Sequence, residues 1–443
     1  MASLVAVSVC LFLCQVVTAQ QSPAVDNGYG AGYEIKGVND YSFNELLSQG
    51  ITTVGQKLKI WNVPVGLLSP QIRCFVRMHN FEICGFCHSK EKRFRAVKFT
   101  YPSVAPNGDS VALSGLAVFP IVDGNSLARM MIYNDFVAAG KGSAPTASMP
   151  IQSVIAADNT LCVFPDCYGY GSTSDKDHPF LFFQYHARCV VECALAALDV
   201  VSDMGITLDA GFYSWNTGYS KGGGVALAAQ RYIETSLSED LQHRINLRWT
   251  LCGGGIYNPE EIFKHGVQIN DLGFPAIFPL SLKSLYMTYG DMFGDIEQTD
   301  FYSPMAKEAG IDSLLRYEEG LWQFSKDLEA SIKGRDPSLY FDSAVIDTSS
   351  EIYRIVCSAL AMEDIVQGWH PVSPVAFYHS KTDACLPYDV TMKSIETICD
   401  GSANYVVKSP QINGSHSFTG FQYFAMVLGR SEPALYRKFF EQR

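Results

Sequence analysis

The feature that most constrains this sequence is a run of glycines around one serine, in the stretch WNTGYSKGGGVALAAQ at 215–230. The strand-like segment GFYSW begins just before it, and an alanine-rich helical segment follows. A strand that turns at once into a helix needs residues without side chains beside the turn, because the two elements approach closely there. Gly218 and Gly222 meet that need on either side of Ser220.

Glycine-rich loops of two kinds begin helices. One kind binds phosphate through backbone N–H groups, and the other presents a nucleophile from a tight turn. The phosphate pattern G-x-x-x-x-G-K-[ST] is not met, because GKGS at 140–143 has glycine after the lysine and Asp135 where the first glycine belongs. Residues 218–222 read G-x-S-x-G, which favours a nucleophile elbow with Ser220 at its tip.

Short apolar segments alternate with helical segments around this turn. Such alternation predicts an α/β fold, with a mostly parallel sheet and helices on both of its faces. Two β-rich segments, joined by a turn at 106–109, precede this alternation. The predicted strands that follow are RMMIYNDF (129–136), TLCVFPD (160–166), GFYSW (211–215), LRWTLCGGG (247–255), PVAFYHSKTD (374–383) and NYVVKS (404–409).

The alternation stops between 257 and 369. This stretch contains a segment with helical spacing at 318–334 and a run rich in aromatic residues and methionine at 273–295. We expect 257–369 to be a helical cap inserted over the carboxyl edge of the sheet. The core would then comprise 94–256 and 370–443, while 20–93 forms a cysteine-containing N-terminal extension without a predicted fold.

The first 19 residues, MASLVAVSVCLFLCQVVTA, have an apolar centre and end in small residues. This pattern predicts a signal peptide and a secreted protein, with a signal anchor as the alternative. The composition, 47% hydrophobic and 18% charged, is that of a globular protein. A net charge of −12 argues against a nucleic-acid partner.

Cysteines are numerous, and 11 of the 13 remain once Cys10 and Cys14 leave with the leader. In an oxidising compartment we expect most of them to form disulfides, with at least one thiol left over. Cys385 and Cys399 would close a short local loop. Cys189 and Cys193 lie on one helix face, so each bonds elsewhere or remains a small core residue.

A serine nucleophile in an elbow needs a base and an acid, which follow it in the chain as acid and then histidine. Only His416, in NGSHSF, lies after the last strong acid candidate. Asp383 ends a predicted strand, from which it could orient the imidazole. Asp389 and Asp400 are alternatives for the acid.

Backbone donors for a developing oxyanion are expected at two places. One is the N–H of Lys221 at the start of the helix, and the other is the N–H of Phe136 or its neighbour after the strand at 129–136. Neither a metal nor a cofactor is predicted, because the sequence shows no ligand cluster with zinc spacing.

From about residue 96 onward the chain resembles the α/β-hydrolase superfamily, with secretory lipases and capped carboxylesterases the most similar members. The resemblance lies in VALSGLAVFP, PDCYGYGSTSDKDHPFL, GYSKGGG, HSKTDACLPY and NGSHSF. It implies a catalytic triad of Ser220, Asp383 and His416. One departure is Asp135-Phe136, where the family usually has His-Gly near the oxyanion.

These patterns favour a secreted serine hydrolase that cleaves small-molecule or lipid carboxylic esters, with transient contact between the cap and a lipid interface. A serine peptidase of related architecture is one alternative. A catalytically silent hydrolase fold used for binding or adhesion is another. Such silent proteins typically lose the serine or the histidine, and here both residues are present.

Overall fold

A computed structural model describes residues 32–60, 92–121, 126–136, 140–311, 321–402 and 404–441. The predicted signal peptide lies outside the described residues, as do Cys74, Cys84 and Cys87. The domain boundaries predicted from the sequence stay predictions.

Within the described residues, nine strands form one sheet in the order β1-β2-β3-β5-β4-β6-β7-β8-β9. The first three pairings, β1 with β2, β2 with β3 and β3 with β5, are antiparallel, and all the others are parallel. The strands are β1 Glu34–Ser42, β2 Arg93–Val104, β3 Ser110–Ile121, β4 Ser126–Asn134, β5 Thr160–Pro165, β6 Thr207–Tyr219, β7 Leu247–Gly253, β8 Val375–Tyr378 and β9 Tyr405–Lys408.

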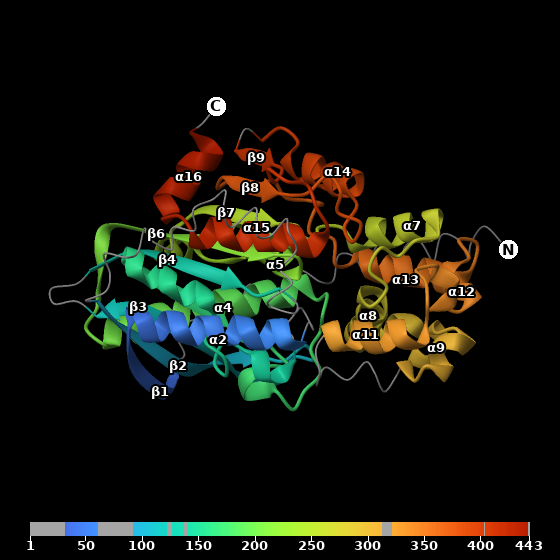
Figure 1. The fold of residues 1–443 in the computed structure, drawn as a ribbon, viewed down its shortest axis with the longest axis horizontal. Coiled ribbons are helices and arrows are strands. Elements are labelled where there is room, and N and C mark those ends of the chain that lie inside the picture. The colour runs from blue at the N-terminus through green and yellow to red at the C-terminus, as the bar shows by residue number, and fades with distance from the viewer. Residues whose placement is uncertain are drawn as a thin grey trace.

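Helices cover both faces of this sheet (Figure 1). Apolar side chains of α4, α5 and α14 pack in one buried cluster, and those of α2, α15 and α16 pack in another. The α-helices are α2 Phe43–Ile60, α4 Phe183–Asp203, α5 Lys221–Ser236, α6 Glu239–Ile245, α7 Pro259–Ile269, α8 Ile277–Phe293, α9 Pro304–Glu308, α11 Leu321–Ser331, α12 Ser343–Ile346, α13 Glu351–Ala361, α14 Tyr388–Cys399, α15 His416–Leu428 and α16 Glu432–Phe440.

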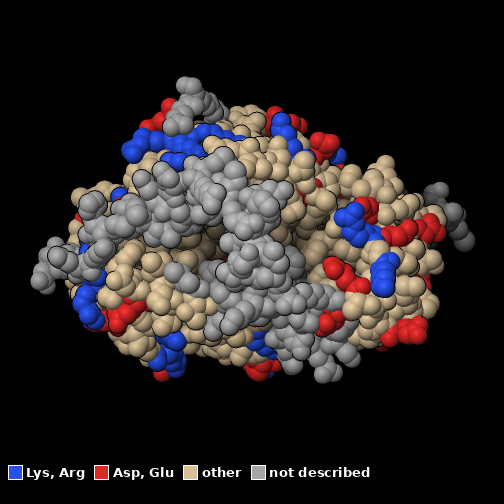
Figure 2. All heavy atoms as spheres, viewed as in Figure 1, with Lys and Arg blue, Asp and Glu red and all other residues tan. Residues whose placement is uncertain are grey.

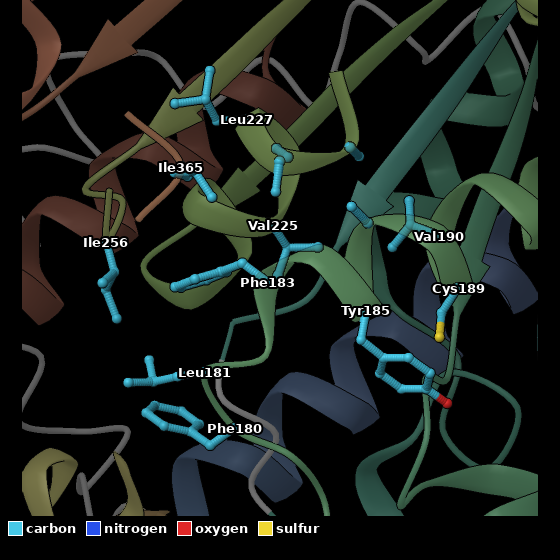
Figure 3. Close-up of a cluster of buried hydrophobic side chains, with 14 of the residues drawn as sticks. Phe180, Leu181, Phe183, Tyr185, Cys189, Val190, Val225, Leu227, Ile256 and Ile365 are labelled. Atoms are coloured by element: carbon cyan, nitrogen blue, oxygen red, sulfur yellow. The ribbon is translucent and has the colours of Figure 1, made fainter. Parts of the chain in front are cut away.

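The predicted fold class is confirmed, because the apolar segments of the sequence form the strands of a mostly parallel sheet between two helical layers. All six residues of β5 and all four of β8 are buried, as expected for strands covered on both faces. The packing between α4 and α5 depends on side chains such as Phe183, Val190 and Val225 (Figure 3).

The described part of the N-terminal extension belongs to the same sheet. β1 pairs with β2 from Glu34↔Thr100 to Ser42↔Arg93, with one irregularity between Ile35 and Gly37. Phe43 and Leu46 of α2 are buried in the cluster that also contains the α15 and α16 side chains. The sequence did not predict this strand or this helix, because neither segment shows a clear apolar period.

Between β7 and β8 the chain leaves the sheet and forms α7 to α13, the group of helices to the right of the sheet in Figure 1. A buried carboxyl group joins this region to the core. Glu363 accepts hydrogen bonds from the backbone N–H of Phe183 at 2.9 Å and from the hydroxyl of Tyr289 at 2.6 Å. Phe183 begins α4 of the core, and Tyr289 lies at a kink within α8.

The outer surface carries charges of both signs. In Figure 2, Lys and Arg gather at the upper left, and both signs are mixed over the helices at the right. Met287, Met292 and Met305, on α8 and α9, are between 39% and 47% exposed. None of the described helices is long and apolar enough to cross a bilayer. Contact between the cap and a lipid interface stays a prediction.

We predict that Glu363→Gln makes the protein more stable than the wild type at pH 9. Burial raises the pKa of Glu363 from 4.5 to about 8, against the hydrogen bonds from Tyr289 and Phe183. As the pH rises, the carboxyl group therefore loses its proton earlier in the unfolded chain than in the folded protein. The wild type loses stability between pH 4.5 and pH 8, by at most about 1.4 kcal/mol per pH unit. Glutamine keeps one acceptor oxygen, has an NH2 donor in place of the O–H of the protonated acid, and does not ionise.

Urea unfolding of both proteins at pH 5, 7 and 9 measures the effect. Glu351→Gln, at an exposed position in the first turn of α13, serves as the matched control and should follow the wild type. A Glu363→Gln variant whose stability also follows the wild type from pH 5 to pH 9 would contradict the expected proton release.

Candidate active site

Ser220 lies in a strained turn between β6 and α5. Its backbone has φ 57° and ψ −126°, which side-chain-bearing residues rarely adopt. A Cβ atom on Gly218 would lie 2.2 Å from the Gly222 carbonyl oxygen, and one on Gly222 would lie 2.3 Å from the Asn134 carbonyl oxygen. Only glycine fits at both positions, so the glycines of the sequence motif are explained by close packing around the turn.

The three residues predicted as a triad are joined by hydrogen bonds. His416 Nε2 lies 2.8 Å from Ser220 Oγ, and His416 Nδ1 lies 2.7 Å from Asp383 Oδ2. Ser220 follows β6, Asp383 lies in the loop after β8, and His416 is the first residue of α15 after β9. The alternatives for the acid, Asp389 and Asp400, lie in the first turn of α14 and at its end, outside these bonds.

Asp383 is held in its ionised form. Burial disfavours the charge, but His416 and a hydrogen bond from the Leu386 N–H outweigh it and leave the pKa of Asp383 below its ordinary value. Asp383 Oδ1 accepts from the N–H groups of Cys385 and Leu386 at 2.9 and 3.0 Å. Because an ionised carboxylate only accepts, the proton of the neutral imidazole lies on Nδ1 and leaves Nε2 to face Ser220.

A serine that the sequence analysis missed connects the acid loop to the histidine loop. Ser380 Oγ donates to the carbonyl oxygen of Gly414 at 2.9 Å and accepts from its N–H at 3.1 Å. The hydroxyl of Tyr219 also donates to the His416 carbonyl oxygen at 2.6 Å. No sequence pattern marks Ser380, since its partner lies 34 residues away.

The predicted oxyanion donors lie beside the turn. Lys221 is the first residue of α5, and the first N–H groups of a helix have no acceptor within that helix. Phe136 follows β4 and lines the same cavity as Ser220 and His416. The end of β4 is tied to β6 by Asn134, whose amide donates to Asn216 Oδ1 at 2.6 Å. Their role as oxyanion donors stays a prediction.

Ser220 and His416 open onto a cavity of about 310 Å³. Residues inside and outside the segment between β7 and β8 contribute walls, with Phe274, Ile277 and Arg335 coming from that segment. Aromatic side chains dominate on the core side, where Phe136, Phe180, Phe421 and Phe424 line it. Phe180 lies beside Leu181 and near Ile256 at the edge of the buried cluster in Figure 3. The cavity is therefore mostly apolar, with the hydroxyl and the imidazole at one wall.

The prediction of disulfides is wrong for the described cysteines. All eight are free thiols, among them Cys385 and Cys399, which were candidates for a local bond. Cys385 lines the cavity, whereas Cys399 is a buried residue at the end of α14. Among the residues that the structure describes, no group of three His, Cys, Asp or Glu is arranged to hold a metal ion.

Solved structures share this fold across most of the chain. One is the rice cell wall degrading esterase LipA from Xanthomonas oryzae, at 17% identity and TM-score 0.64, covering 92% of this chain and 96% of that one. Another is Candida antarctica lipase A, at 14% identity and TM-score 0.54, covering 75% and 74%. The expected resemblance to the α/β-hydrolase fold is thus confirmed. No protein-family model matches the chain, and no curated protein matches it in sequence.

We predict that Ser380→Ala destabilises the protein by about 0.5–1.5 kcal/mol, because the partly buried N–H of Gly414 loses its acceptor. Urea unfolding measures this loss. The matched control is Ser394→Ala, which removes a hydroxyl that donates within its own helix to the Val390 carbonyl oxygen. Equal losses in the two variants would show that Ser380 does not tie the two loops together.

Proposed function

We propose that this protein is a serine hydrolase that cleaves carboxylic esters. The observation that carries the proposal is the chain of hydrogen bonds from Ser220 through His416 to Asp383, at the wall of an apolar cavity. Ser220 is the nucleophile, His416 the general base and acid, and Asp383 the group that orients the imidazole. Ser220 and Asp383 are only 8% and 5% exposed, so their hydrogen bonds to His416 are not chance contacts at the protein surface.

The reaction follows from these contacts. His416 Nε2 takes the proton of Ser220 as Oγ attacks the acyl carbonyl, and the imidazolium is stabilised by the Asp383 carboxylate. The tetrahedral intermediate collapses to an acyl-enzyme while His416 returns the proton to the leaving alcohol. Water then attacks the acyl group with the same histidine as base, which restores Ser220 and releases the acid.

Two backbone groups are proposed to stabilise the oxyanion. The Lys221 N–H has the helix α5 behind it, whose N-terminal end attracts negative charge. The Phe136 N–H would supply the second donor from the loop after β4. Loss of one such donor typically costs about a hundredfold to a thousandfold in rate.

The walls of the cavity favour an apolar acyl group. Phe136, Phe180, Phe274 and Ile277 present rings and branched chains rather than hydrogen-bonding groups to the space beside Ser220. An apolar substituent that fills this space leaves water, and its burial contributes about 25 cal/mol per Å². The names of the two structural neighbours, an esterase and a lipase, agree with this choice of substrate.

Two other functions are tested by the same experiments. A serine peptidase would use the same three residues on an amide bond. A silent binding protein would keep the fold and the cavity without the chemistry. The proposal extends to secretion, on the strength of the leader-like residues 1–19, and release of that segment can be read from the N-terminus of the mature protein.

A fluorophosphonate probe should label the wild type at one serine. Ser220→Ala should abolish labelling and lower kcat about 10⁴-fold or more, because the nucleophile is lost. The matched control is Ser417→Ala, which removes another hydroxyl from the wall of the same cavity and should label normally. A folded wild type that does not react with the probe would favour the binding protein.

A series of p-nitrophenyl esters of rising acyl length should show kcat/KM increasing with chain length until the cavity is filled. Each added methylene that leaves water is worth about 0.8 kcal/mol, or roughly fourfold in kcat/KM. Aminoacyl and dipeptidyl p-nitroanilides, assayed alongside, test the amide substrates. Faster turnover of the anilides than of every ester would support the peptidase instead.

A further inference from the structure

The side chain of Lys221 is buried although it carries an amine. It is the residue directly after Ser220, and it is 7% exposed. The side chain lines a second, smaller cavity of about 40 Å³ behind the turn. Phe136 lines both this cavity and the larger one at Ser220, so the loop after β4 separates the two. The Lys221 amine therefore lies behind the candidate oxyanion donors.

A buried histidine accepts a hydrogen bond from this amine. His178 Nδ1 lies 2.6 Å from the carbonyl oxygen of Tyr168, which can only accept, so Nδ1 carries the proton. Burial and the charge of Lys221 keep the pKa of His178 well below its usual value, so the ring is neutral. Nε2 is then an acceptor, and Lys221 Nζ donates to it.

The other groups around the amine determine its charge. Burial lowers the pKa of Lys221 to about 8, while Cys167, Asp135 and Cys189 act to raise it. His186 packs against His178 with 4.8 Å between ring centroids, and it too is kept neutral because burial lowers its pKa. Tyr170 covers the other side of His178 at 4.7 Å. The amine is thus protonated at neutral pH, and Asp135 is the carboxylate that favours this state.

The amine connects the turn to two loops that form walls of the substrate cavity. One is the loop after β4, with Asp135 and Phe136, and the other is the loop after β5, with His178 and Phe180. Lys221 Nζ lies 5.9 Å from the centroid of the Phe180 ring, within range of a cation–π interaction. Phe136 and Phe180 both line the cavity at Ser220.

We propose that Lys221 is a positioning residue for the Ser220 site, an inference that rests on the proposed function. Its ammonium group holds the Asp135–Phe136 loop and the His178–Phe180 loop against the turn, so that the backbone donors of Lys221 and Phe136 face the oxyanion. Loss of the proton removes the attraction to Asp135, which loosens the loop after β4 and lowers the rate at alkaline pH. The residue acts through these loops and does not contact the substrate.

The sign of the pH effect follows from the charge. Below its pKa the amine is positive and is attracted to Asp135 and to the ring of Phe180. Above about pH 8 the amine loses its proton, and its attraction to Asp135 and to the Phe180 ring is lost. The oxyanion exists only in the transition state, so the loss appears in kcat more than in KM. The wild type should therefore show an alkaline fall in kcat with a midpoint near pH 8.

The test is the pH dependence of kcat and KM from pH 6 to pH 10 with a p-nitrophenyl ester, corrected for spontaneous hydrolysis. Lys221→Met shortens the unbranched side chain by one atom and removes both the charge and the donor to His178. We expect its kcat to be about 10- to 100-fold below the wild type at pH 7, with KM little changed and with no fall near pH 8. The matched control is Lys176→Met, an exposed lysine on the loop of His178, which should keep the wild-type profile.

Asp135→Asn gives a second measurement that does not depend on the folding of Lys221→Met. Because the attraction between the ammonium group and this carboxylate holds the loop, its removal should lower kcat at pH 7, as Lys221→Met does, and leave a smaller fall near pH 8. A wild-type kcat together with a wild-type alkaline fall, in Asp135→Asn or in Lys221→Met, overturns the role of Lys221. Normal fluorophosphonate labelling of Ser220 in those variants leaves the proposed function standing. A wild type that does not label overturns both.

Discussion

The close contact between the first turn of α5 and the loop after β4 is the constraint on which the site depends. The Asn134 carbonyl oxygen occupies the space that a side chain at position 222 would need, and the Gly222 carbonyl does the same for position 218. Packing on both sides keeps Ser220 in a conformation that costs about 1–3 kcal/mol. The same contact brings Phe136 next to the serine. One steric requirement thus fixes Ser220 and the neighbouring loop together.

The other two residues of the site reach Ser220 because of the sheet order. β6, β7, β8 and β9 are adjacent and parallel, so the loops after β6, β8 and β9 emerge at the same edge. The long insertion between β7 and β8 does not disturb this, since the two strands still pair side by side. The insertion contributes walls to the cavity, whereas the three hydrogen-bonded residues all lie outside it.

Local sequence patterns made the turn at Ser220 and the order of the three site residues predictable. The glycines around Ser220 have a steric cause that any strand–helix turn shares, and the order serine, acid, histidine follows from the order of the strands. The Ser380–Gly414 contact and the Lys221–His178 contact escaped prediction, because each joins residues more than 30 positions apart without a local signature. The disulfides were inferred from compartment and number alone. Neither property shows whether two sulfur atoms will approach each other in the fold.

The unpaired cysteines have a consequence for how the chain acquires its structure. Burial raises the pKa of all eight described thiols, so in the finished fold they hold their protons and react slowly. Before collapse they have no such protection, and any oxidant present can cross-link them in arrangements that the sheet cannot accommodate. In the folded chain, burial rather than disulfide bonding is what protects these sulfur atoms.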